Sequence, residues 1–249
     1  MAGNTSVPGA SVTSRAFALL GAFDTEHRQL TLSDLARRTG LSLTTAHRLV
    51  AELVQWRALR RTSDGEYVIG RRLWEVGLLA PVQSDLRQVA SPFLHDVYGA
   101  TLATVHLAIR EGYHVLYVDR LSGTASVPIL SQVGSQMPLH ATGVGKVLLA
   151  YAPEEMQLSV LGSLERVTAY TVTQPGRLRE ELRRVHELGF AQTVEEMSLG
   201  ACSVAVPIRR SGGRVVAALG IVVPNLKRDR PRLIAALQVA AQGIGRSLS

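Results

Sequence analysis

The 249-residue chain contains a single cysteine, Cys202, and only two lysines, Lys146 and Lys227. One cysteine cannot form an internal disulfide, so the sequence gives no indication of an oxidising compartment. No apolar run approaches the roughly 20 residues that a membrane-spanning helix needs. The N-terminal stretch MAGNTSVPGASVTSRAF lacks a basic start followed by an apolar core. We therefore predict no signal peptide and expect a cytoplasmic protein.

Arginine supplies nearly all of the positive charge, and the formal net charge is +7 with a pI of about 10.2. This balance suits a polyanionic partner, but charge alone does not distinguish DNA or RNA from a membrane surface. Hydrophobic residues make up 46% of the chain and charged residues 19%. These values are typical of an ordered globular protein, long enough for one large domain or two unequal domains.

The N-terminal quarter contains helix signals at close spacing. Residues 1–10 are small and polar, and we expect them to form a disordered arm. An apolar face over residues 14–23 predicts a first helix. A second helix is predicted to begin at Thr31, where Asp34 completes a capping box, and to end at Gly40.

A third helix is predicted from the stretch LSLTTAHRLVAELVQW, residues 41–56, with Ser42 as its N-cap. Asp64-Gly65 then indicates a two-residue hairpin between strands near residues 59–62 and 66–69. A helix pair joined by a glycine turn and followed by a hairpin is typical of a winged helix-turn-helix unit. The expected buried stripe of the third helix is Leu41, Leu49, Leu53 and Trp56.

The opposite face of this third helix carries many hydrogen-bonding side chains. We expect Arg48 to pair with guanine, and the hydroxyl groups to reach phosphates or base edges. Arginines on the hairpin and on the first helix would hold the flanking DNA backbone. The alternative is a solvated face on a small three-helix unit. The predicted DNA-binding residues are Arg15, Ser42, Thr44, Thr45, His47, Arg48, Arg60 and Arg61.

Residues 71–98 are predicted to form a helical connector, in which Ser91-Pro92 marks either a kink or a restarted helix. Beyond it, two hairpins are predicted, turning at Glu111-Gly112 and at Ser211–Gly213. The intervening helices include one whose apolar face would contain Leu178, Leu182, Val185 and Leu188, and a final helix covers roughly residues 230–247. Strand pairs alternating with helices favour an α+β domain around an antiparallel sheet.

Two patterns suggest enzyme chemistry but do not complete it. TGVGKV, residues 142–147, lacks the first glycine of a phosphate-binding loop and the hydroxyl residue after its lysine. Its glycines favour a close approach of the helix start to a ligand. Cys202 is a candidate nucleophile with His140 or His106 as base, but a small buried cysteine at the start of a strand, lining a pocket at most, is the better interpretation.

Acidic and histidine residues also fall short of a catalytic or metal site. Glu195 and Glu196 are adjacent in a loop, so their side chains are expected to diverge into solvent. His106, His114 and His140 would bind a metal only if the fold gathered them, because no ligand spacing is present. We therefore predict no catalytic residues, no metal, no cofactor and no enzymatic activity.

The sequence resembles the IclR family of bacterial transcriptional regulators. The DNA-binding half of that family is similar to SRAFALLGAF, LTLSDLARRTGLSLTTAHRLVAELVQW and DGEYVIGRRLWEVG. The two signature stretches of its effector-binding domain are similar to SQVGSQMPLHATGVGKVLLA and EEMSLGACSVAVPIRRSGGRVVAALGI. The resemblance runs from about residue 12 to the last helix, with every stretch in the family's order.

This resemblance implies a winged helix-turn-helix, a connecting helix and a GAF-like ligand domain. The expected domains are a disordered arm at 1–10, a DNA-binding domain at 11–70, a connector at 71–98 and an effector-binding and oligomerisation domain at 99–249. Homodimers or dimers of dimers are implied. Leu43 replaces a basic residue common in the family and so removes one expected phosphate contact.

The same resemblance implies a small-molecule effector, expected to be an organic or aromatic acid, bound on the sheet of the C-terminal domain. GIVVP at 220–224 replaces a common Ser-x-Ser-Gly-Pro ending, so the hydroxyl groups usual at this position are missing. The expected effector-binding residues are Ser126, Ile129, Gly143, Val144, Gln192, Cys202, Gly220 and Val222.

The chain is accordingly expected to be a ligand-responsive regulator that binds double-stranded operator DNA and no membrane. Effector binding would change how two recognition helices are held apart. Two alternatives remain at this stage. One is a constitutive DNA-binding protein whose C-terminal domain only oligomerises, and the other is a small-molecule enzyme with a helical assembly domain.

Overall fold

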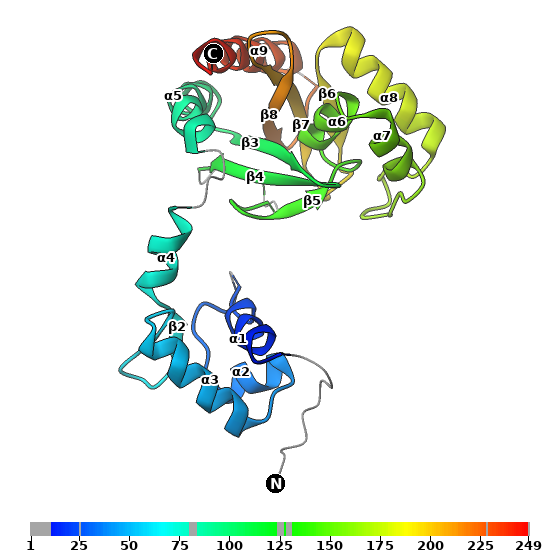
Figure 1. Ribbon diagram of the computed structural model, residues 1–249. Helices are drawn as coiled ribbons and strands as arrows, with labels where there is room; N and C mark the ends of the chain where they lie inside the picture. Colours follow the sequence, from blue (N-terminus) through cyan, green and yellow to red (C-terminus); the bar gives the residue numbers. More distant parts are fainter. Residues whose placement is uncertain are drawn as a thin grey trace. The chain divides into compact units, whose positions relative to one another are not determined.

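The computed structural model describes residues 11–24, 26–79, 84–123, 127, 131–227 and 229–248 (Figure 1). The predicted arm at 1–10 and the predicted ligand contacts Ser126 and Ile129 lie outside these described residues. The chain divides into two compact units, Met1–Pro81 and Val82–Ser249. Among the helices described, none combines the length and apolar character needed to cross a membrane.

The first unit contains four helices and a short hairpin in its described part. They are α1 (Val12–Gly21), α2 (Leu32–Thr39), α3 (Leu43–Gln55), β1 (Leu59–Arg61), β2 (Tyr67–Ile69) and α4 (Arg71–Gly77). Leu19, Leu35, Leu49 and Leu59 are almost fully buried and join α1, α2, α3 and β1 in one core. This core holds α3 against both preceding helices.

The predicted helix boundaries around the glycine turn are confirmed. Thr31 Oγ1 accepts a hydrogen bond from the Asp34 amide at 3.1 Å, and Asp34 in turn accepts from the Thr31 amide. Gly40 ends α2 with a φ of 67°, the left-handed conformation that glycine adopts at little cost. Ser42 Oγ accepts from the Thr45 amide and begins α3. The spacing between α2 and α3 is therefore fixed by local hydrogen bonds.

Two predictions for this unit are wrong in detail. Trp56 follows the last turn of α3, with 52% of its surface exposed and the Arg72 guanidinium 5.7 Å from its ring, so it does not join the buried stripe. In the hairpin, Arg61 pairs with Tyr67, and the Thr62 amide donates to Glu66 at 2.8 Å. The loop thus has three residues rather than two, with Gly65 in the left-handed conformation at a φ of 86°.

The second unit is built on a six-stranded antiparallel sheet in the order β5-β4-β3-β8-β7-β6 (Figure 1). Its strands are β3 (Thr104–Glu111), β4 (His114–Leu121), β5 (Gln136–Pro138), β6 (Ala191–Val194), β7 (Cys202–Arg209) and β8 (Val215–Val223). Its described helices are α5 (Ser84–Thr101), α6 (Gly143–Ala150), α7 (Glu154–Leu161), α8 (Pro175–Leu188) and α9 (Arg230–Ser247).

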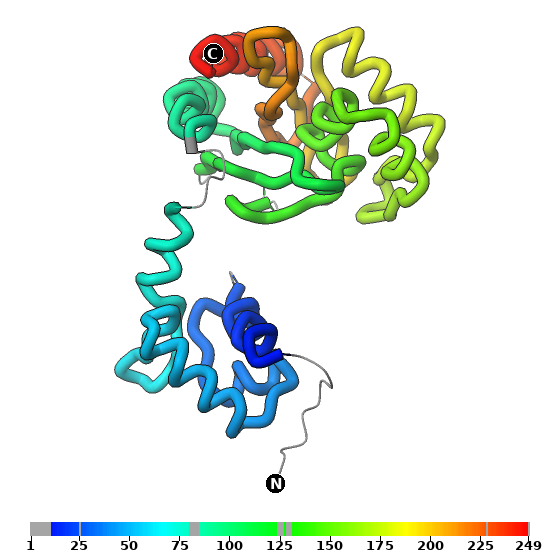
Figure 2. The backbone as a smooth tube through the Cα atoms, in the orientation of Figure 1, coloured from blue at the N-terminus to red at the C-terminus, as the bar shows by residue number. Residues whose placement is uncertain are grey.

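Helices cover both faces of this sheet. The helices α5 and α9 run side by side over one face (Figure 2). Leu94, Leu219 and Leu237 share a core there. On the other face α6 packs against the sheet, and α7 and α8 pack against α6. Burial from both sides explains why β3 is buried without interruption from Thr104 to Ala108, whereas its sequence predicts alternation.

Three further predictions are settled by this unit. Helix α5 continues through Pro92 as a single helix, with Leu86, Leu94 and others on its buried face, so it does not restart there. Glu111 pairs with His114, which places the first hairpin turn one residue later than predicted. Leu188, expected on the buried face of α8, is exposed because the helix ends there.

Candidate functional site

The exposed face of α3 is the first candidate site. Thr44, His47 and Arg48 are exposed along one side of this helix, whereas Leu49 and Val50 are buried in the core. Leu43, in the first turn, is exposed as well. The first unit therefore leaves these three of the side chains predicted to meet DNA accessible.

Two of the predicted hydroxyl groups have structural partners in the helix cap. Ser42 Oγ accepts from the Thr45 amide and donates to Thr45 Oγ1 at 2.9 Å. Thr45 is half-buried, whereas Thr44 is exposed and lies in the first turn. Since helix N-termini favour anions, this turn offers both a hydroxyl and a positive dipole end to a phosphate.

The predicted arginines are constrained to different degrees. Arg48 forms an ion pair with Glu52 at 3.5 Å, in the same helix. Arg61 stacks on Tyr67 at 5.9 Å and donates to Gly65 O, so its side chain is ordered over the hairpin. Arg60 is exposed, and Arg15 donates to Ser11 O at 3.4 Å.

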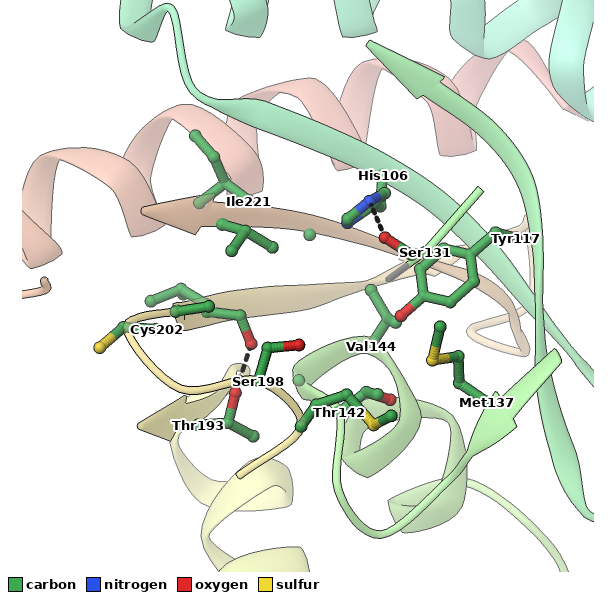
Figure 3. A pocket seen from close by; sticks show the side chains of 17 residues that line it. His106, Tyr117, Ser131, Met137, Thr142, Val144, Thr193, Ser198, Cys202 and Ile221 are labelled. Carbon is green, nitrogen blue, oxygen red and sulfur yellow. Dashed lines mark hydrogen bonds between the residues drawn. The ribbon is translucent and has the colours of Figure 1, made fainter. Parts of the chain in front are cut away.

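The second candidate site is a cavity in the second unit, between the sheet and the start of α6 (Figure 3). Its walls come from the strands β3 to β8, from Ser131, from Thr142 and the first turn of α6, and from the loop between β6 and β7. The lining residues are His106, Tyr117, Ser131, Met137, Thr142, Gly143, Val144, Thr193, Met197, Ser198, Ala201, Cys202, Ser203, Val204, Gly220, Ile221 and Val222.

Polar groups in this cavity are arranged around an apolar floor. His106 Nε2 and Ser131 Oγ are hydrogen-bonded at 2.8 Å, and Thr193 Oγ1 and Ser203 Oγ at 2.6 Å (Figure 3). Burial, with a smaller contribution from the Arg120 charge, lowers the pKa of His106 to about 3, so the ring is neutral at pH 7. Burial raises the pKa of Tyr117 to about 12, which keeps its phenol a hydrogen-bond donor.

Two glycines let α6 lie close to the sheet. A Cβ on Gly143 would lie 2.5 Å from Ser203 Oγ, and one on Gly220 would lie 2.7 Å from Val144 Cγ1. These glycines therefore serve protein packing directly and bring the first turn of α6 to the cavity. Thr142 Oγ1 accepts from the Gly145 amide and caps the helix.

Five of the predicted effector-binding residues line this one cavity. They are Gly143, Val144, Cys202, Gly220 and Val222. Gln192 does not lie with them. In β6 the buried residues are Ala191 and Thr193, so Gln192 points to the opposite side and Thr193 takes the cavity position. The prediction for Gln192 is thus one residue away from the cavity position, and successive side chains of a strand lie on opposite faces of the sheet.

Sequence reasoning missed most of the polar lining. Tyr117, Ser131, Thr142, Thr193, Ser198 and Ser203 lie in separate segments with no shared local pattern. Two signals could have found some of them. Thr142 immediately precedes the glycine motif, and strand alternation places Thr193 and Ser203 on one face with the sheet floor.

The histidines considered as metal ligands or as a base have different surroundings. His114 is exposed, whereas His140 is buried and shares a hydrogen bond with Glu165 O at 2.8 Å, away from the His106–Ser131 pair. No group of three His, Cys, Asp or Glu side chains within the described ranges is placed to hold a metal ion. Burial raises the pKa of Cys202, whose Sγ donates to Pro224 O.

The prediction of a solvated Glu195-Glu196 loop is wrong for Glu196. Its carboxylate is buried and accepts a hydrogen bond from Lys146 Nζ at 2.6 Å. Lys146, in the glycine motif TGVGKV, is itself buried and also contacts Glu181 at 2.6 Å. The motif's lysine therefore serves an internal ion pair.

Comparison with known proteins gives matches over both units. The family model described as "IclR helix-turn-helix domain" matches residues 12–63, and "Bacterial transcriptional regulator IclR C-terminal" matches residues 80–246. The transcriptional regulator XynR of Escherichia coli is 30% identical over 240 residues, covering 94% of this chain and 95% of that protein. The glycerol operon regulatory protein of Streptomyces coelicolor is 31% identical over 240 residues, covering 94% of each.

Solved structures agree with these matches. An IclR homologue from Microbacterium hydrocarbonoxydans, complexed with 4-hydroxybenzoate, is 36% identical with a TM-score of 0.89 and covers 96% of this chain and 99% of that one. The IclR protein of Thermotoga maritima is 28% identical with a TM-score of 0.82, covering 95% and 98%. The helix-turn-helix unit, the cavity-bearing α+β unit and these relatives agree: the chain belongs to the IclR family of bacterial transcriptional regulators.

Proposed function

We propose that the protein is a transcriptional regulator whose α3 reads an operator in the major groove and whose C-terminal cavity binds a small organic acid that changes operator affinity. The observation that carries this proposal is the pairing of an exposed, hydroxyl- and arginine-rich α3 with a lined cavity in the second unit. The protein performs no catalysis in this proposal. Its site of action is cytoplasmic, where the operator DNA lies.

For DNA, the proposed division of labour follows from the constraint on each side chain. Thr44 lies in the first turn of α3, and the N-terminus of a helix favours a bound phosphate. Arg48 exchanges its exposed intrahelical partner Glu52 for a guanine, since exposed ion pairs contribute little. Arg60, on the exposed side of β1, holds the DNA backbone.

Replacing Arg48 by alanine is expected to lower the discrimination between operator and random DNA by about 1–3 kcal/mol. The reason is that a bidentate contact to one base is lost while the phosphate contacts stay. Binding to both DNAs is measured by fluorescence anisotropy at several salt concentrations.

Arg60→Ala is the matched control for this experiment. It removes one positive charge of the same kind and is expected to weaken operator and random DNA by similar factors, with a shallower salt dependence. An Arg48→Ala protein with unchanged operator preference would contradict the assignment of Arg48 to base readout.

For the effector, the electrostatics of the cavity favour an anion of modest size. The described lining contains no acidic side chain, and the hydroxyl groups of Tyr117, Thr193 and Ser198 lie around it. Arg120 is close enough to oppose protonation of His106, so its field is positive at the cavity wall. The first turn of α6 adds partial positive charge. An aromatic or aliphatic carboxylic acid fits this set, and 4-hydroxybenzoate, bound by a relative, is the first probe to test.

Effector and operator are expected to change each other's affinity by the same factor, because coupling between two binding equilibria is reciprocal. Calorimetric titration of a panel of carboxylic acids, with and without operator DNA, measures the coupling. Equal effector affinities with and without operator DNA would indicate a constitutive DNA-binding protein instead.

Ser198→Phe places a large side chain on the cavity wall and is expected to abolish effector binding while operator binding persists.

The signal is proposed to pass through the segment that joins the units. In a two-fold dimer, recognition helices meet half-sites about 34–36 Å apart or a multiple of that spacing, so changes of a few ångströms alter binding. The oligomeric state proposed is a homodimer or a dimer of dimers, with residues 99–249 supplying the effector site and subunit contacts. Residues 71–98 then serve as the connector between residues 11–70 and this domain, and the part of α5 that they include also packs on the sheet of the second unit.

A further inference from the structure

One wall of the effector cavity is a loop, Glu195–Ala201, between β6 and β7. Met197, Ser198 and Ala201 of this loop line the cavity (Figure 3). The Glu195 amide donates to Ala201 O at 2.9 Å, and the Gly200 amide donates to the Glu195 carboxylate at 2.6 Å. These hydrogen bonds join the two ends of the loop. The position of the loop against the cavity then depends on the contacts of its first residues, Glu195 and Glu196.

A buried ion pair connects this loop to α6. Lys146 is 1% exposed, and its Nζ donates to Glu196 Oε1 at 2.6 Å. Glu196 is 6% exposed and directly precedes the cavity residue Met197. On α6, Lys146 follows the cavity residues Gly143 and Val144 by one turn or less. The ion pair thus joins two walls of the same cavity.

Further hydrogen bonds hold the main chain at the same point. Thr171 Oγ1 donates to Glu196 O at 2.8 Å, and Thr168 Oγ1 donates to Glu195 O at 2.7 Å. Glu195 has a φ of 56°, a left-handed conformation that a residue with a Cβ adopts only when its surroundings enforce it. Strain and restraint are therefore concentrated on the two residues that lead into the cavity wall.

We propose that Glu196 is a positioning residue for the effector site: through Lys146 it fixes the loop Glu195–Ala201 in the place where Met197 and Ser198 meet the ligand. Glu196 is absent from the cavity lining and acts on the ligand only through this loop. The inference rests on the proposed function, because it takes the cavity as the effector site.

The second carboxylate on Lys146 supplies a matched control. Glu181 accepts from the same Nζ at the same distance of 2.6 Å, but it belongs to α8 and carries no part of the cavity wall. Glu181 is 27% exposed and also pairs with Arg177, so a purely structural role for the ion pair predicts a larger loss of stability for the Glu196 variant but no specific change in the loop. A positioning role predicts that only loss of the Glu196 contact disturbs the loop and the ligand.

The test compares Glu196→Gln with Glu181→Gln in the full-length protein without ligand. Hydrogen exchange of the amides in residues 197–201 is expected to accelerate about tenfold or more in Glu196→Gln and to stay within about twofold of the original protein in Glu181→Gln. Thr171→Val, which removes a neutral restraint on the Glu196 main chain, is expected to accelerate the same amides. Equal exchange in the two glutamine variants would overturn the positioning role.

Calorimetry with the carboxylic acids that the original protein binds, 4-hydroxybenzoate among them, provides the second readout. Affinity is expected to fall about tenfold or more in Glu196→Gln and to change less than about twofold in Glu181→Gln. Unchanged affinity in Glu196→Gln would contradict the inference. If the original protein binds none of the acids, that result contradicts the proposed function instead. Hydrogen exchange of the loop amides still tests the role of Glu196 in that case.

Discussion

Replacing Lys146 by methionine is expected to destabilise the C-terminal unit by about 3–5 kcal/mol, because it leaves the buried Glu196 carboxylate without its cation. Glu181 loses the same partner but is 27% exposed and keeps an ion pair with Arg177 at 3.5 Å. The loss of stability therefore comes mainly from Glu196. Urea unfolding followed by far-UV circular dichroism measures it.

The pH dependence of the lost stability tests whether the unpaired Glu196 carboxylate causes it. Burial already raises the pKa of Glu196, and Lys146 opposes that rise. Without the lysine the pKa rises further, so the carboxyl in the folded variant takes up a proton more readily than in the unfolded chain. The lost stability then returns as the pH falls below the raised pKa of the folded variant.

A double variant checks the same argument without titration. Lys146→Met/Glu196→Leu leaves no charge in the buried position, and replacement of a buried ion pair by apolar side chains is often neutral. It is expected to recover most of the lost stability. A single variant as stable as the original protein, or a double variant as unstable as the single one, would show that the ion pair is not what the fold depends on here.

The elements that the sequence predicted well are those determined by neighbouring residues. Thr31 with Asp34, Gly40 and Ser42 each act within one turn of a helix, so their spacing in the chain already states their geometry. Gly189, which ends α8 at a φ of 75°, is a local signal of the same kind. The order of helices and hairpins then indicated both the winged helix-turn-helix and the α+β domain.

The errors arise where a distant partner decides the outcome. Glu196 lies next to an exposed loop in sequence, yet its partner Lys146 is 50 residues away. Trp56 has helical spacing from Leu53, but the helix ends one residue earlier and Arg72 covers its ring. No local pattern pairs Lys146 with Glu196 or Arg72 with Trp56, so neither contact is visible without the fold.

The cavity was only partly predictable for a related reason. Glycines gave a usable signal, because Gly143 and Gly220 mark a close approach of helix and sheet that the structure contains. The hydroxyl groups of the cavity come from strands and loops that the order of the sheet brings together. Only the strand register therefore shows which of them face the cavity. Gln192 and Thr193 differ by one position in β6, and that single step separates the outside of the sheet from the cavity.

Acidification is expected to destabilise the C-terminal unit through His106. The ring is 3% exposed, and its pKa in the folded protein is about 3 against a usual value of 6.5. Between these values the unfolded chain binds a proton that the folded protein does not, so stability falls as the pH falls. The loss attributable to His106 is about 2–3 kcal/mol between about pH 7.5 and about pH 4.5, and about 5 kcal/mol over the whole interval.

His106→Gln isolates this contribution, because glutamine retains a hydrogen-bonding group for Ser131 but does not titrate. Urea unfolding of both proteins is followed by circular dichroism across the pH range. Both tryptophans, Trp56 and Trp74, lie in the first unit, so their fluorescence reports that unit separately and should coincide in the two proteins at each pH.

Only the difference between the two proteins bears on His106. Glu196, whose pKa is raised by burial, contributes with the opposite sign as the pH falls, and other carboxylates contribute as well. These contributions are common to both proteins and cancel in the difference. A stability difference that is constant from neutral to acidic pH would mean that the folded cavity accepts a proton on His106, and the neutral, donor-lined site proposed for an anionic effector would then need a charged imidazolium in its place.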